Sequence, residues 1–131
     1  MDNDRPAGNL GALLGFRFVH ADETEAVIEA EPTEEHRNLH GMIHGGFLAA
    51  LLDTATGWAV HARLPEETPA VHVQLSVQYV RAGVLGRTLV CRATAVGVGR
   101  RIGSTEAVIT QDGKVIARAS GTHAVLTPIP D

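Results

Sequence analysis

The fold is decided by residues 38–57, which read NLHGMIHGGFLAALLDTATG. A glycine-containing loop runs into the His-Gly-Gly sequence at 44–46, and a long apolar stretch follows it. Because the apolar residues from 47 to 60 recur on every side of a helix, we predict a helix that is buried nearly all round. Asp53 is the only Asp, Glu, Lys or Arg between positions 42 and 62. A lone carboxylate inside such a helix loses hydration free energy unless something compensates, which makes it a candidate functional group.

The composition indicates one domain of ordinary size. The chain has 131 residues, of which 44% are hydrophobic, and this is enough to form a real core. A net charge of −4 with both signs interspersed gives no concentrated positive surface, so no nucleic-acid partner is expected. We expect a single domain over residues 1–131, with flexible ends at about 1–8 and 127–131.

Three further features favour a cytoplasmic location. The single Cys91 excludes an intrachain disulfide, so nothing indicates an oxidising compartment. The polar and acidic start, residues 1–6, is unlike a signal peptide. No uninterrupted apolar run approaches the roughly 18 to 20 residues of a membrane span, so no membrane association is expected.

Two hydrophobic periods indicate an α+β domain. The helical period runs from about residue 44 to about residue 63, where Leu64-Pro65 stops it. A period of two then begins at Val71, and its apolar residues alternate with His, Gln and Ser as in a half-buried strand. Asp112-Gly113 is a two-residue hairpin signal. The patterns predict a helical turn or two at 9–14 and strands at 15–21, 24–31, 71–80, 88–96, 101–111 and 115–126.

The expected order of elements is two strands, one long helix and a four-stranded antiparallel meander. A sheet that wraps one apolar helix is an α+β layer arrangement. One sheet and one helix leave at least one face and two edges uncovered, so we expect the chain to associate with copies of itself.

The opening stretch, in this order of elements, resembles the motif of a known family. Asn38, Gly41, the His-Gly-Gly at 44–46 and Asp53 make the chain similar to hotdog-fold acyl-CoA thioesterases, over roughly residues 14–126. The similarity is closest to the branch with the phenylacetate-pathway and the Arthrobacter-type 4-hydroxybenzoyl-CoA thioesterases. It implies a hotdog fold, in which an antiparallel sheet wraps one long central helix. It also implies a coenzyme A thioester as the substrate, and no metal or redox cofactor.

The resemblance assigns the two principal roles to Gly45 and Asp53. Thioester hydrolysis needs a donor for the developing oxyanion, and the first N–H groups of a helix have no intrahelical acceptor. The family pattern gives this role to the Gly45 N–H, and makes Asp53 the nucleophile or the general base that activates water. The two positions are about 12 Å apart along the helix, too far to serve one carbonyl in one chain. In the family each subunit of a dimer offers one of these groups, so a homodimer or a homotetramer is expected.

The neighbouring positions have a possible role in the site and a structural alternative. Asn38 would orient the thioester or the water, or act as an ordinary loop residue. His44 would contact the substrate or brace the loop. Gly45 and Gly46 would alternatively be needed only for close packing, and Asp53 would be a buried carboxylate satisfied by groups such as Thr56.

The substrate-binding candidates come partly from departures from the family pattern. Many relatives have Ser or Thr where this chain has Gly57, which leaves Thr54 or Thr56 to hold the water. Relatives also often have Ser or Thr where this chain has His72, whose imidazole is a base, a substrate contact or a packed residue. Arginines would meet the coenzyme A phosphates, although an Arg on an exposed turn is usually only solvated. The full set of candidates is Gly46, Thr54, Thr56, His72, Arg81, Arg100 and Arg101.

Other functions compete with hydrolysis. His36, His40 and His44 are spaced by four, as in some metal sites, but the glycines around them argue against one continuous helix. A hotdog domain that only binds acyl-CoA is the main alternative, and an acyl-thioester hydratase or dehydratase is a further one. We expect hydrolysis of an acyl-CoA, with an aryl or arylacetyl group as the suggested acyl part.

Overall fold

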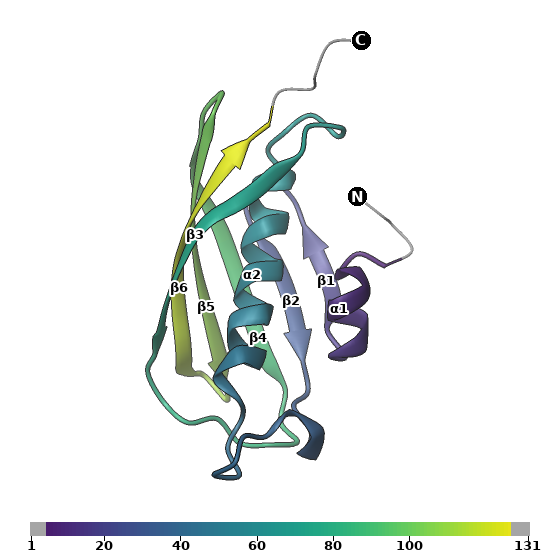
Figure 1. Cartoon of the computed structure of the whole chain (residues 1–131), viewed down its shortest axis with the longest axis vertical. Helices are drawn as coiled ribbons and strands as arrows, with labels where there is room; N and C mark the ends of the chain where they lie inside the picture. The colour runs from purple at the N-terminus through teal and green to yellow at the C-terminus, as the bar shows by residue number, and fades with distance from the viewer. Residues whose placement is uncertain (1–4, 127–131) are drawn as a thin grey trace.

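The computed structural model describes residues 5–126, so most of the predicted flexible ends lie outside the described residues. One antiparallel sheet of six strands curves around a single long helix, α2 (Gly45–His61) (Figure 1). A short helix α1 (Gly8–Leu13) precedes the sheet, and a 3-10 turn η1 (Glu34–His36) precedes α2. The strands are β1 (Arg17–Ala21), β2 (Ala26–Ala30), β3 (Ala70–Tyr79), β4 (Leu89–Val98), β5 (Ile102–Gln111) and β6 (Lys114–Val125). This is the predicted hotdog arrangement, and the fold class is confirmed.

The core lies between α2 and the concave face of the sheet. Leu51 and Leu52 of the helix are fully buried, and Ile109 of β5 and Leu89 of β4 are buried with them. Removing one such side chain, as in Leu51→Ala, typically costs about 2 to 5 kcal/mol, because a cavity is left as well as lost burial. Packing against the sheet therefore holds α2 in place more than its intrinsic propensity does.

The prediction that α2 is buried nearly all round is wrong for the single chain. The Asp53 side chain is 55% exposed, and Gly46 is also exposed. The sheet curves round only part of the helix, so the remaining face is left partly exposed by residues 5–126. The run of apolar residues in α2 was too uniform to reveal this, because small residues such as Ala49 and Ala50 occupy the partly exposed positions.

The predicted four-stranded meander is also wrong, because β3 does not lie beside β4. The sheet order is β1-β2-β4-β5-β6-β3, so only β4, β5 and β6 form a meander, and β2 pairs with β4. The long connection from β3 to β4 crosses the end of the sheet and is held there by the buried Gln111. The Gln111 amide donates to the carbonyls of Val84 and Arg87, and its oxygen accepts from the Val84 N–H.

Two edges of the sheet have no neighbouring strand in the single chain. One is β1 and the other is β3, which pairs with β6 alone. Edge strands offer unpaired backbone groups to another chain. The β3 edge also carries the exposed apolar side chains of Val71 and Val73. Among residues 5–126, no helix has the length and apolar character needed to cross a membrane.

Candidate active site

The loop before α2 is shaped by Asn38. Its side-chain oxygen accepts hydrogen bonds from the N–H groups of His40, at 2.8 Å, and Met42, at 3.1 Å. Its own N–H donates to the Met42 carbonyl, and Gly41 lies between them with a φ of +79°, which favours glycine. The loop therefore folds back on itself and delivers His44 to the start of the helix.

The start of α2 leaves one backbone donor free. His44 is the N-cap residue: its Nδ1 accepts from the Gly46 N–H at 2.7 Å, and its carbonyl accepts from the Phe47 N–H at 3.0 Å. Nothing within residues 5–126 accepts a hydrogen bond from the Gly45 N–H. Because that group also lies at the positive end of the helix dipole, it is suited to bind a carbonyl oxygen that gains negative charge.

A pocket of about 310 Å³ opens beside this free donor. Tyr79 at the end of β3 closes one side of it, and the Tyr79 hydroxyl donates to the Gly45 carbonyl at 3.0 Å. A Cβ added to Gly45 would lie 3.2 Å from the Tyr79 ring, so the glycine also eases close packing there. The pocket is lined by Asn38, Met42, Ile43, Gly45, Leu48, Tyr79, Val80, Arg81, Ala82 and Gly83.

Asp53 belongs to a second group of residues, farther along α2. It does not line the pocket beside Gly45. Since β3 runs back along α2, the beginning of β3 meets the second half of the helix, and there His72 Nδ1 lies 3.6 Å from Asp53 Oδ2. His72 Nε2 lies 2.8 Å from the Thr56 hydroxyl, and Thr56 itself is fully buried. In one chain the predicted residues are therefore divided between two places.

His123 is a member of this second group that the sequence analysis missed. It is the cross-strand partner of His72, and the two rings lie 4.1 Å apart between their centres. His123 is 1% exposed, and its Nε2 lies 2.8 Å from the Thr105 hydroxyl. Burial, together with the nearby His72, lowers the pKa of His123 to about 4. The alternation in β6 contained the necessary signal, because His123 is in phase with the buried Ala117 and Ala119.

The remaining predicted residues are placed apart from these groups. The Thr54 hydroxyl donates to the Ala50 carbonyl at 2.8 Å, one turn back in its own helix. Arg100 and Arg101 lie in the turn between β4 and β5. This turn is near Val125, where β6 ends, and near Ala70, where β3 begins. Tyr79 and the pocket are at the opposite end of β3, so these two arginines do not meet Arg81 within one chain.

His36 makes its contacts within the loop and with the first turn of α2. His36 Nδ1 accepts from the Thr33 N–H at 3.0 Å, and the His36 ring stacks on Phe47. Within the part of the chain that the structure describes, no group of three or more His, Cys, Asp or Glu side chains is placed to hold a metal ion.

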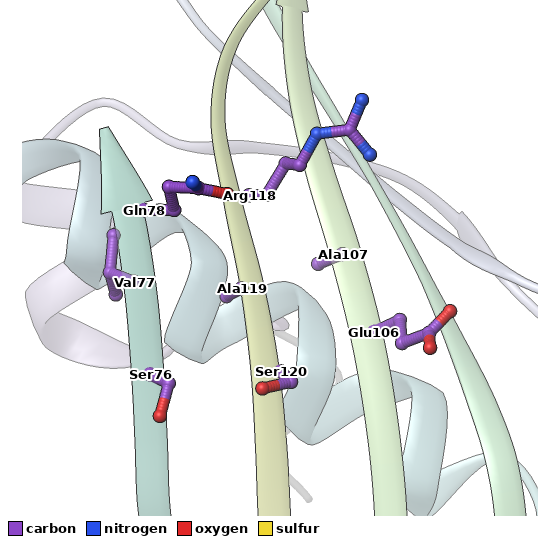
Figure 2. Close-up of a pocket in the computed structure, with 8 residues that line it drawn as sticks. All are labelled: Ser76, Val77, Gln78, Glu106, Ala107, Arg118, Ala119 and Ser120. Carbon is purple, nitrogen blue, oxygen red and sulfur yellow. The ribbon is translucent and has the colours of Figure 1, made fainter. Parts of the chain in front are cut away.

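A hollow of about 450 Å³, larger than the pocket beside Gly45, lies away from both groups. Figure 2 shows that it lies over β3, β6 and β5, with α2 on the other side of these strands. Its exposed side chains are Ser76, Gln78, Arg118, Ser120 and Glu106, while Ala107 and Ala119 are buried. It holds none of the predicted residues, so size alone does not locate the candidate site.

The comparisons with known proteins agree on one family. The sequence model described as the thioesterase superfamily matches residues 40–117 of this chain. Acyl-coenzyme A thioesterase 13 of Homo sapiens is 29% identical over 119 residues, which cover 88% of this chain and 84% of that protein.

Solved structures with the same fold extend this result. A variant of phenylacetic acid degradation protein PaaI from Thermus thermophilus has a TM-score of 0.83 and 33% identity, covering 89% of this chain and 98% of that one. The protein smu.793 of Streptococcus mutans, bound to acetyl CoA, has a TM-score of 0.79 and 26% identity, covering 86% and 89% of the two chains. The narrower placement beside 4-hydroxybenzoyl-CoA thioesterases stays a prediction, as does the cytoplasmic location.

Proposed function

This chain belongs to the thioesterase superfamily, and on that premise we propose that it hydrolyses an acyl-coenzyme A thioester to a free acid and coenzyme A. The observation that carries the proposal is the Gly45 N–H, which has no acceptor within residues 5–126 and opens on a pocket. An acyl-CoA substrate is supported by the similarity to acyl-coenzyme A thioesterase 13 and to a protein solved with acetyl CoA.

Gly45 is the proposed oxyanion donor. Its N–H is aligned with the helix dipole, and the absence of a side chain lets a thioester carbonyl approach the backbone. Gly46 is less suited to this role, because its N–H already donates to His44 Nδ1. His44 and Asn38 then act by holding the loop and the helix start, each through the hydrogen bonds that its side chain accepts.

Asp53 is the proposed carboxylate of the reaction, as nucleophile or as general base. More than half of its side chain is exposed, so water and substrate can reach it. Eight residues of helix separate it from Gly45, a rise of about 12 Å. We therefore propose that each site takes Gly45 from one subunit and Asp53 from its partner in a homodimer, with a homotetramer as the next level of assembly.

The β3 edge is the proposed dimer contact. It has free backbone groups along one side and the exposed Val71 and Val73, and it lies next to the uncovered face of α2. Pairing of two such edges would bring a second helix towards the face that carries Asp53. The same contact would cover exposed apolar surface, which favours association.

The pocket beside Gly45 suggests where the acyl-CoA lies. Met42, Leu48 and Val80 give it apolar walls, and Arg81 at its rim can bind a coenzyme A phosphate. We propose an aryl or arylacetyl acyl group, which the similarity to a phenylacetic acid degradation protein supports. A pocket completed by a second subunit would set the final limit on acyl size.

The test is release of free thiol from a panel of short, medium, long and aromatic acyl-CoAs, by the unmodified protein and by Asp53→Asn. We expect hydrolysis by the unmodified protein and a fall of roughly 10²-fold or more in the variant, in line with loss of a base. The assay has little background from the protein, because Cys91 is fully buried and burial raises the pKa of its thiol to about 12.

Two other outcomes would contradict the proposal. Full activity in a folded Asp53→Asn variant would remove Asp53 from the mechanism. Binding of acyl-CoA by the unmodified protein, without release of thiol from any member of the panel, would favour a binding module.

A further inference from the structure

The polar group around His72 is unusual in combining a carboxylate, two imidazoles and two hydroxyls. We call Asp53, Thr56, His72, Thr105 and His123 the histidine cluster. It joins four elements, since its members come from α2, from β3 and from the neighbouring strands β5 and β6. Only Asp53 is exposed, and the His72 side chain is 20% exposed. The cluster thus leads from solvent into the core.

The hydrogen bonds of Thr56 favour one tautomer of His72. The Thr56 hydroxyl lies 2.8 Å from the Leu52 carbonyl oxygen and 3.1 Å from the Asp53 carbonyl oxygen, and both carbonyls can only accept. The same hydroxyl lies 2.8 Å from His72 Nε2. A hydroxyl that donates its one proton to either carbonyl accepts a hydrogen bond from Nε2–H, and we assign His72 this tautomer.

This assignment leaves His72 Nδ1 as the basic atom of the neutral ring. Nδ1 is also the atom that faces Asp53, at 3.6 Å from Oδ2. That separation is longer than a direct hydrogen bond. In the neutral form two proton acceptors therefore face each other on the exposed side of the cluster.

His123 keeps the rest of the cluster uncharged. The titratable groups that face His72 are Asp53 from α2 and His123 from β6. His123 is held against Thr105 in the core, and burial lowers its pKa to about 4. At neutral pH His123 therefore carries no positive charge.

We propose that His72 is a proton relay, which receives through Nδ1 the proton that Asp53 takes from the attacking water. This inference rests on the proposed function and makes Asp53 a general base. The water oxygen forms a bond to the thioester carbon, whose C=O electron pair moves onto the carbonyl oxygen. The water proton passes to Asp53 and then to His72 Nδ1. When the oxyanion pair re-forms the C=O bond, the C–S bond breaks, and the thiolate leaves with the bonding pair and takes that proton back through Asp53.

The relay predicts a pH dependence that a packing role for His72 would not produce. When an imidazole must accept a proton in addition to a carboxylate, activity is lost at a higher pH on the acid side than when the carboxylate acts alone. For His72→Gln, whose amide can still donate to Thr56, we expect kcat to fall by about 10- to 100-fold. We also expect the acid limb of its kcat profile to move to lower pH.

The experiment is the kcat–pH profile of three proteins. They are the unmodified chain, His72→Gln, and the matched control His20→Gln, which changes a histidine of β1 that pairs with Glu25 outside the cluster. The control should keep both kcat and the acid limb. An acid limb that is the same in the unmodified protein and in His72→Gln would overturn the relay.

A second measurement does not depend on the folding of any variant. Nitrogen NMR of histidine-labelled, unmodified protein at about pH 8 should show His72 protonated at Nε2 and unprotonated at Nδ1. The opposite tautomer would refute the proton assignment. If Asp53→Asn abolishes hydrolysis while His72→Gln keeps the original acid limb, the relay fails and the proposed function stands. If no acyl-CoA is hydrolysed by the unmodified protein, both fail.

Discussion

At the scale of single residues, His123 shows how burial makes stability depend on pH. An unfolded chain protonates a histidine below about pH 6.5. In the folded protein the buried ring resists protonation, because burial and His72 lower the pKa of His123 to about 4. Between these two pH values the unfolded state binds more protons than the folded state does, so the free energy of unfolding decreases as the pH falls.

We predict a measurable contribution of His123 to acid sensitivity. Between pH 7.5 and 4.5 the unmodified protein should lose on the order of 2 to 3 kcal/mol more stability than His123→Gln, which cannot titrate. Denaturant unfolding of both proteins at the two pH values measures this difference. Comparing the changes with pH, and not the absolute stabilities, removes the effect of packing in the variant. Equal losses in both proteins would show that His123 is not the group responsible.

At the scale of elements, the first turn of α2 supplies the proposed oxyanion donor. Any suitable N-cap residue would start a helix here. His44, as the N-cap, accepts from the N–H of Gly46 and leaves the N–H of Gly45 free. Proline is favoured at the first position of a helix, because the N–H that it removes has no helical acceptor. His44 is already extended, with ψ at 134°, as the residue before a proline must be.

We therefore predict opposite results for two substitutions at one position. Gly45→Pro removes the proposed oxyanion donor while keeping a helix start, and kcat should fall by about 10²- to 10³-fold. Gly45→Ala is the matched control, since it keeps the N–H but adds the same Cβ, 3.2 Å from the Tyr79 ring. Its kcat should stay within about tenfold of the unmodified protein, a bound set by a modest packing strain of about 1 kcal/mol.

The measurement is thiol release by both variants, with the helical signal and the unfolding midpoint as checks on folding. Similar losses in Gly45→Pro and Gly45→Ala would mean that packing against Tyr79, and not the N–H, explains the glycine.

At the scale of the whole molecule, the proposed site is incomplete in one chain. The pocket with Gly45 and the cluster with Asp53 lie at different positions along α2, and the face of α2 that carries Asp53 is uncovered. If two chains complete each site, a chain without the donor and a chain without the carboxylate should complement each other.

We predict that mixing Gly45→Pro with Asp53→Asn restores activity that neither variant has alone. Random exchange of subunits makes half of the dimers mixed, and each of these has one intact and one doubly altered site, so roughly a quarter of the unmodified activity should return. Co-expression or refolding of the two variants together, followed by the thiol assay, measures this. If both groups acted within one chain, every site would keep one defect and the mixture would stay inactive.

The sequence by itself determined the elements of this protein and its central motif. Hydrophobic periods of 3.6 and of two are local properties, and they predicted α2 and the strands to within a few residues of Gly45–His61, Ala70–Tyr79 and the others. The spacing of Asn38, Gly45 and Asp53 was also enough to predict the thioesterase family. Both inferences succeeded because each depends on residues that are near each other in the chain.

Only the tertiary structure decided which distant segments meet. It placed β3 beside β6 instead of β4, and thereby put His72 against both Asp53 and His123. It also left Asp53 exposed, because the curved sheet covers only one side of the helix. Strand neighbours depend on how the sheet closes over the core, which is a balance of contacts across the whole chain. Local patterns carry no information about that balance, so the packing of His123 against His72 could not be predicted from them.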